Sequence, residues 1–81
     1  MKSINVNVTY YAPEGIDSTV EKEIMTVAET YGGEEGGGSG FMFGSNERDF
    51  DIDFPDTASA ERFLKEAIKK FKKYKVKGSI V

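Results

Sequence analysis

Apolar and polar residues alternate in two segments of the chain, and a period of two is typical of a β-strand with one buried face. In residues 4–10, isoleucine, valine and tyrosine alternate with asparagine and threonine. In residues 49–54, phenylalanine and isoleucine alternate with three aspartates. Phe41 and Phe43 precede this second segment across a turn-rich tetrad, which predicts a hairpin. Residues 76–81 are partly β-branched and predict a last, short strand.

Two other segments have the period of an α-helix. In residues 16–31 and again in residues 60–71, apolar side chains recur at spacings of three and four, which places them on one stripe of a helix. The stripes expected to be buried are Ile16, Val20, Ile24, Val27, Ala28 and Tyr31 in the first helix, and Ala60, Phe63, Leu64, Ala67, Ile68 and Phe71 in the second.

The ends of both helices carry recognisable signals. Ser18 followed by Glu21 fits a capping box at the start of the first helix. Gly32 supplies a residue that tolerates the left-handed conformation at the end of that helix. Asp56 or Thr57 can cap the second helix.

The segment 32–40 contains six glycines, two glutamates and one serine. This composition predicts a flexible loop. A phosphate-binding loop does not fit, because Ser39 stands where a P-loop requires lysine. The dinucleotide pattern GxGxxG fails as well, since its last glycine would fall on Phe43. We therefore expect a hinge or an adaptable contact and no bound nucleotide or other cofactor.

The expected order of elements is strand, helix, strand, strand, helix, strand within a single α+β domain, residues 1–81. Two split βαβ halves of this kind form a ferredoxin-like plait, a four-stranded antiparallel sheet with both helices on one face. Right-handed crossovers place the first and third strands in the centre of the sheet.

Strand parity then divides the residues between the two faces of the sheet. The set expected beneath the helices is Ile4, Val6, Val8, Phe41, Phe43, Phe50, Ile52, Phe54, Val76 and Ile80. The set expected on the open face is Asn5, Asn7, Thr9, Met42, Asp49, Asp51, Asp53, Lys75, Lys77 and Ser79.

The run from Arg48 to Leu64, R-D-F-D-I-D-F-P-D-T-A-S-A-E-R-F-L, resembles the third strand and second helix of the RNA-recognition motif. The resemblance implies the same plait, in which aromatic residues of the open face stack on bases. In this chain Asp49 and Asp51 stand at the positions of the two stacking aromatics, and Glu47 stands at the position of the leading lysine or arginine. The resemblance therefore implies the fold without the RNA-binding activity.

Composition narrows the chemistry further. The chain has no cysteine and no histidine, so it offers neither a thiolate nor the usual zinc ligand and neutral-pH proton shuttle. Its serines have no histidine to activate them, and we expect no enzymatic activity. No apolar run approaches the roughly 20 residues of a membrane span. These features predict a soluble, cytoplasmic protein.

Charge is divided unevenly along the chain. Residues 1–64 carry thirteen acids against four bases, a net charge of −9, whereas residues 65–81 carry seven lysines against one glutamate, a net charge of +6. Either pole can recognise a partner of opposite sign. Helix electrostatics and solubility alone also explain such a division.

The acidic pole suggests a small inhibitor of the kind that phages and mobile elements carry against host nucleases. Its acidic sheet face would occupy a basic, nucleic-acid-binding surface of a partner protein by imitating spaced phosphates. Three alternatives remain: a solvated face that resists aggregation, a divalent-ion site, and weak nucleic-acid binding at the basic pole. The predicted partner-binding residues are Asp49, Asp51, Asp53, Asn5, Asn7 and Glu47, and the residues of the alternative nucleic-acid site are Lys69, Lys70, Lys72, Lys73, Lys75 and Lys77.

Overall fold

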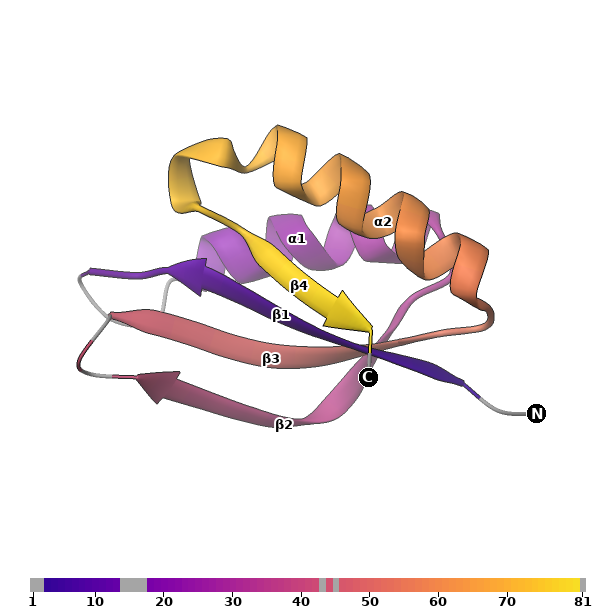
Figure 1. Ribbon diagram of the computed structural model, residues 1–81, viewed down its shortest axis with the longest axis horizontal. Helices are drawn as coiled ribbons and strands as arrows, with labels where there is room; N and C mark the ends of the chain where they lie inside the picture. The colour runs from indigo at the N-terminus through magenta and orange to yellow at the C-terminus, as the bar shows by residue number, and fades with distance from the viewer. Residues whose placement is uncertain (1–2, 14–17, 43, 45, 81) are drawn as a thin grey trace.

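A computed structural model describes residues 3–13, 18–42, 44 and 46–80. Within these ranges, the side chains of residues 37–39, 41 and 42 are not described. Its elements are those in Figure 1: β1 (Ile4–Tyr11), α1 (Ser18–Thr30), β2 (Glu34–Met42), β3 (Glu47–Phe54), α2 (Thr57–Lys70), a short 3-10 helix η1 (Lys72–Tyr74) and β4 (Lys77–Ile80).

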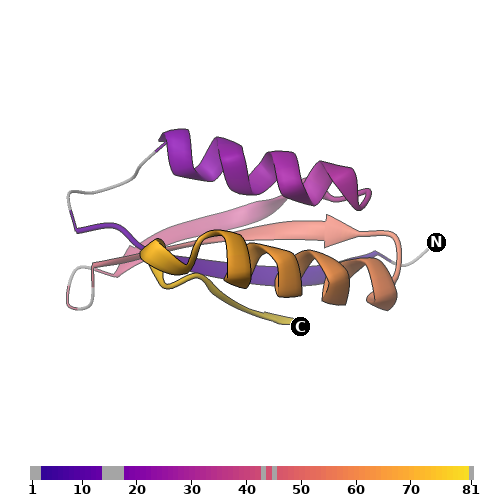
Figure 2. The same cartoon turned by 90° about the horizontal axis from the view of Figure 1, so that it is seen from above.

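The four strands form one antiparallel sheet in the order β2-β3-β1-β4. Both helices lie over the same face of this sheet, as Figures 1 and 2 show. The arrangement confirms the predicted ferredoxin-like plait, with the first and third strands in the centre.

The register of the two central strands confirms the predicted sidedness of β3. Val6 lies opposite Ile52 and Val8 opposite Phe50, and all four side chains are buried beneath the helices. The aspartates between them point to the other face of the sheet and are half-buried. Apolar area removed from water on one face, at about 25 cal/mol per Å², therefore drives the pairing that exposes the acids on the other.

Aromatic side chains fill much of the core between the sheet and the helices. The rings of Phe54 and Phe63 lie 5.0 Å apart between centroids, and those of Tyr10 and Phe50 meet edge to face at 6.3 Å. The buried positions of the helices are Val20, Ile24, Val27, Ala28, Ala60, Phe63 and Ala67, with Phe71 just after α2.

Two residues of the predicted core are exposed. Ile68 has 45% of its surface exposed and Ile80 has 40%. The apolar stripe of α2 is wider than the surface that the sheet offers, because β4 at that edge is only four residues long. Ile16, Phe43 and the side chain of Phe41, also predicted to be covered, lie outside the described residues and side chains.

The predicted signals at two helix ends are present. The Asp56 carboxylate accepts a hydrogen bond of 2.7 Å from the Ser59 backbone amide, which caps α2. Gly32 has a positive φ of 82° after α1. The amide of Gly33 donates to the Ala28 carbonyl at 2.8 Å and that of Gly32 to the Glu29 carbonyl at 3.0 Å, the two bonds of a Schellman ending.

The prediction of a flexible loop at 32–40 is wrong. Residues 34–42 are the edge strand β2, which pairs with β3 through a register shift between Glu35 and Ser39. Glycine is a poor strand former, so composition alone favours a loop. Backbone pairing with β3 outweighs that preference, and Gly36 approaches so closely that a Cβ there would lie 3.1 Å from the Asp51 carbonyl oxygen.

The last strand is shorter than predicted. It begins at Lys77 instead of Val76, because Lys75 adopts a left-handed conformation with a φ of 51°. Lys75 therefore lies ahead of β4 and not on it. Val76 is buried, as expected.

Gly33 is a site where tertiary packing excludes a side chain. An added Cβ would lie 2.7 Å from Phe54 Cε1 and 3.0 Å from the Ala28 carbonyl oxygen. We expect Gly33→Ala to lower the free energy of unfolding by about 1–3 kcal/mol, as overpacking does. Gly44→Ala is the matched control, because a Cβ there meets nothing within 4 Å. Urea unfolding that shows equal stability for the two variants would contradict this packing.

Candidate functional site

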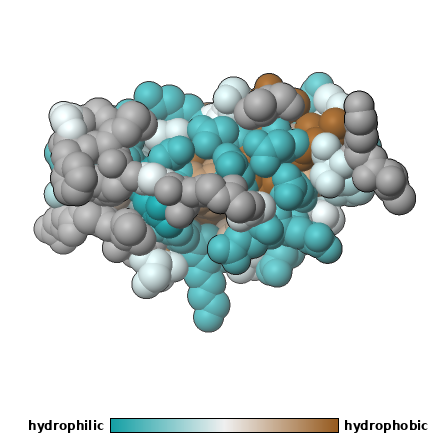
Figure 3. Space-filling model, turned by 90° about the horizontal axis from the view of Figure 1, so that it is seen from below, coloured by the Kyte–Doolittle hydropathy of each residue, from teal (hydrophilic) through white to brown (hydrophobic). Residues whose placement is uncertain are grey.

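Acidic side chains collect on the face of the sheet that the helices leave open. We define the acidic face as Glu34, Glu47, Asp49, Asp51 and Asp53. The four residues of β3 alternate along one side of that strand, and Glu34 of β2 lies directly opposite Asp53. Viewed from below, the described surface is mostly hydrophilic, with the stronger hydrophobic colour toward one end and paler brown between the hydrophilic residues near the centre (Figure 3).

Amide side chains from β1 hold the three aspartates. Asn5 Nδ2 donates to Asp53 Oδ1 at 3.0 Å. Asn7 Nδ2 donates to Asp51 Oδ1 at 2.9 Å and, at a longer 3.4 Å, to Asp49 Oδ2. An asparagine amide is a neutral donor. These bonds therefore fix the positions of the carboxylates without cancelling their charge.

Cations are scarce next to these three aspartates. Among the described residues, no lysine or arginine lies within ion-pair distance of the three aspartates. Glu47 differs from them, because the Lys77 ammonium lies 2.9 Å from its carboxylate. The Lys75 ammonium lies 5.3 Å from the centre of the Tyr11 ring. The net negative charge of the acidic face is thus concentrated at Glu34 and the three aspartates.

Glycine in β2 leaves space beside Asp49. Gly40 lies opposite Asp49, and a Cβ at residue 40 would lie 2.9 Å from Asp49 Oδ1. Any larger residue there would crowd this carboxylate. The glycine therefore keeps the side of Asp49 that faces the sheet edge open.

The structure brings the predicted partner-binding residues together. Asn5 donates to Asp53 and Asn7 to Asp51 and Asp49, a set of five residues that we call the ladder, and Glu47 lies at the end of the β3 row. Sequence reasoning missed Glu34, because it was assigned to a loop. Its position on this face depends on the pairing of β2 with β3.

The lysines predicted as an alternative site lie on the segment from the end of α2 to the start of β4. All six are exposed: Lys69 and Lys70 end α2, Lys72 and Lys73 belong to η1, Lys75 follows it and Lys77 begins β4. Tyr74, expected to be available for stacking on bases, is half-buried and packs against the core. Lys77 is already engaged by Glu47.

A charged pair lies on the helix side of the sheet. The Arg48 Nε atom lies 3.0 Å from Glu21 Oε2, and Arg48 Nη2 lies 3.3 Å from Glu21 Oε1. The Tyr10 hydroxyl also donates to Glu21 Oε2, at 2.7 Å. The hydrogen bond with Glu21 raises the pKa of the Arg48 guanidinium above its ordinary value. Only 13% of the Arg48 side chain and 20% of the Glu21 side chain are exposed.

Sequence reasoning missed this pair and expected Glu21 in a capping box. The available signal was parity: Arg48 shares the inward parity of Phe50 and Ile52 on β3. A cation on the covered face requires a charged or polar partner. That partner lies 27 residues away in the sequence, so spacing could not identify it.

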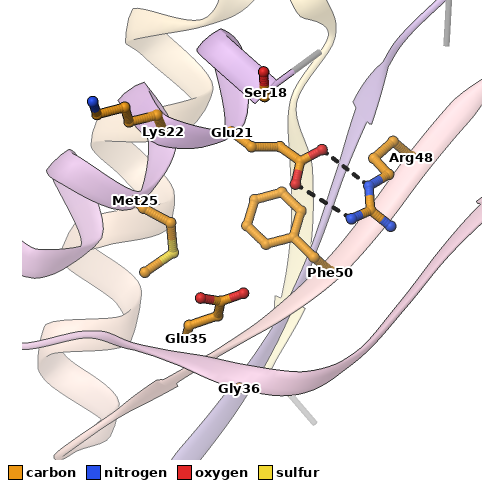
Figure 4. Close-up of a pocket in the computed structure, with 8 residues that line it drawn as sticks. All are labelled: Ser18, Glu21, Lys22, Met25, Glu35, Gly36, Arg48 and Phe50. Carbon is orange, nitrogen blue, oxygen red and sulfur yellow. Dashed lines mark hydrogen bonds and ion pairs between the residues drawn. The ribbon is translucent and has the colours of Figure 1, made fainter. Parts of the chain in front are cut away.

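The pair borders a cleft of about 450 Å³ between α1 and the strands β2 and β3 (Figure 4). Met25 of α1 and Phe50 of β3 supply its apolar surface, and Glu35 of β2 points into the same space (Figure 4). Lys22 of α1 lies at its margin. The cleft combines a closed ion pair with an apolar floor.

Two features are absent from the part of the chain that the structure describes. In residues 3–13, 18–42, 44 and 46–80, no three His, Cys, Asp or Glu side chains are grouped so that they could hold a metal ion. In the same residues, no helix is long and apolar enough to cross a membrane.

Comparison of the chain with family models, with curated proteins and with solved structures finds no significant match.

Adding a charge to the ladder should weaken the fold. Asn7→Asp keeps the shape of the side chain but replaces the shared amide donor with a fourth carboxylate. We expect the free energy of unfolding to fall by about 1–2 kcal/mol at pH 7, from one lost hydrogen bond and from repulsion across the strands.

The loss in Asn7→Asp should shrink near 1 M salt, which screens the repulsion between the carboxylates. Urea unfolding at several salt concentrations measures this effect. A variant as stable as the parent protein at pH 7 would show that Asn7 does not hold the aspartates.

The ion pair on the covered face should be energetically coupled. A double-mutant cycle with Glu21→Gln and Arg48→Met should give a coupling energy of about 1–2 kcal/mol, because both side chains are mostly withdrawn from water. Denaturant unfolding of the four proteins measures it. Additive effects of the two substitutions would argue against a structural role for the pair.

Proposed function

We propose that this protein is a non-enzymatic binding module whose acidic face occupies a basic surface of a partner protein. One observation carries the proposal: neutral amides hold the three aspartates in place, so their charge remains uncompensated. A face that served only solubility would not require its carboxylates to be held in fixed positions.

The spacing of the carboxylates favours a partner surface that ordinarily holds nucleic acid. Alternate residues of a strand lie about 6.8 Å apart, so Asp49, Asp51 and Asp53 form a regularly spaced row of negative charge. A nucleic-acid backbone likewise offers regularly spaced negative charge to lysine and arginine. A protein that binds the row would lose its access to nucleic acid, and the module would act as an inhibitor.

Fixed carboxylates also improve the energetics of association. Ordering a flexible side chain on binding costs about 0.5–1.5 kcal/mol. The hydrogen bonds from the side-chain amides of Asn5 and Asn7 reduce that cost, because they order the carboxylates before the partner arrives. The concentrated charge steers a basic partner toward this face and speeds the encounter.

The second candidate function is weak nucleic-acid binding by the basic pole. One observation favours it, namely that all six lysines from Lys69 to Lys77 are exposed at one end of the fold. Against it, Lys77 is engaged by Glu47 and Tyr74 packs on the core, so fewer groups are available to phosphates and bases.

The acidic face can be tested by charge-matched substitution. The variant Asp49→Asn/Asp51→Asn/Asp53→Asn removes three charges from the ladder. The control Glu23→Gln/Glu29→Gln/Glu61→Gln removes three charges from exposed helix positions. In affinity capture from a cell lysate treated with nuclease, we expect the parent protein and the control to retain a basic protein and the ladder variant to lose it.

Two results of that capture would contradict the proposal. Equal capture by the ladder variant would remove the acidic face from binding. Loss of all capture after nuclease treatment would show that nucleic acid mediates the contact. A gel shift at low salt with mixed DNA and RNA separates the second candidate, because only binding at the lysines predicts retardation that Lys69→Ala/Lys70→Ala/Lys72→Ala/Lys73→Ala abolishes.

A further inference from the structure

The β2 strand offers an accessible main-chain edge. It lies at the end of the sheet order, and within the described residues it has a partner strand on one side only. Four of its nine residues are glycine and carry no side chain that could shield the edge. Unpaired edges of this kind accept a further strand from another chain.

The two sides of this edge differ in chemistry. On the open side lie Glu34 and, one strand further in, the aspartates of the acidic face. On the helix side lies the cleft of about 450 Å³, where Met25 and Phe50 provide apolar surface beneath α1 (Figure 4).

A strand added to β2 would meet both environments in alternation. Successive side chains of a strand point to opposite faces of its sheet. One set of side chains from the added strand would therefore lie over the acidic face, and the other set would point toward the cleft. The charge of the first environment favours lysine or arginine, and the apolar floor of the second favours an aliphatic residue.

We propose that the β2 edge binds an extended segment of a partner protein in which basic and apolar residues alternate. This inference rests on the proposed function and specifies the partner of the same face. Main-chain hydrogen bonds to β2 supply affinity, and the alternating side chains supply specificity. On the helix side of the edge the Glu21–Arg48 pair is already closed, and Glu35 points into the cleft, so the aliphatic side chains of the segment would meet Met25 and Phe50 beside one carboxylate.

The regularly paired part of β2, on one side of its register shift, is where the added segment can pair. Ser39–Met42 pairs regularly with residues 47–50 of β3, whereas the irregular stretch between Glu35 and Ser39 contains Gly36, at the cleft. The opposite edge of the sheet is a poorer template for a basic segment, because β4 begins with the exposed Lys77.

A labelled peptide of sequence Lys-Val-Lys-Leu-Lys-Val-Lys tests the proposal at about 0.15 M salt. Two control peptides keep its charge: one is N-methylated at every interior amide, and one has the order Lys-Lys-Val-Leu-Val-Lys-Lys. Fluorescence anisotropy measures affinity, and amide NMR shifts locate the site. We expect saturable binding with shifts in β2 and β3, and about tenfold weaker binding of each control peptide.

The outcomes separate this inference from the proposed function. Equal affinity for the methylated and unmethylated peptides, with weaker binding of both by the Asp→Asn ladder variant, would overturn strand addition and leave the acidic face as the binding surface. Unchanged peptide binding by the ladder variant would contradict the acidic face itself. NMR shifts confined to β4 would place the peptide at the other edge of the sheet and overturn the inference. Concentration-dependent shifts in β2 without peptide would show that this edge pairs with a second copy of the chain, and would overturn it as well.

Discussion

The antiparallel register of β1 and β3 is the constraint on which the other features depend. It places Val6 against Ile52 beneath the helices and, in the same step, Asn7 against Asp51 on the open face. A slip of one residue would turn every side chain of β3 to the opposite face. Three carboxylates would then lie in the core, each with a desolvation penalty of several kcal/mol. Core packing and the acidic face are therefore two results of one pairing.

The two faces of β3 treat charge in opposite ways. On the covered side, Arg48 is matched by the Glu21 carboxylate and the pair is largely withdrawn from solvent. On the open side, the aspartates receive neutral donors from Asn5 and Asn7. Charge is thus neutralised where it would disturb the core and kept on the face that the helices leave open. The uncompensated negative charge therefore lies on one face of the sheet.

Glycine in β2 has a structural consequence that extends to the site. A strand with few side chains leaves space beneath α1, and Met25 and the buried Phe50 line the resulting cleft. The same glycines let the β2 backbone approach β3 closely, as Gly36 does at Asp51. The β2 strand is therefore paired with β3 on its inner side, through one register shift, and among the described residues it has no partner strand on its outer side.

Local patterns in the sequence determined the strands β1 and β3, both helices, the Asp56 cap, the left-handed ending at Gly32 and the sidedness of the aspartates. Each depends on a period or a short-range hydrogen bond between residues close in the chain. Tertiary structure alone decided that residues 34–42 form a strand, that Arg48 meets Glu21, that Asn7 holds Asp51, and that Ile68 and Ile80 stay exposed. These features depend on contacts between distant segments, and such contacts leave no spacing in the sequence from which they can be read.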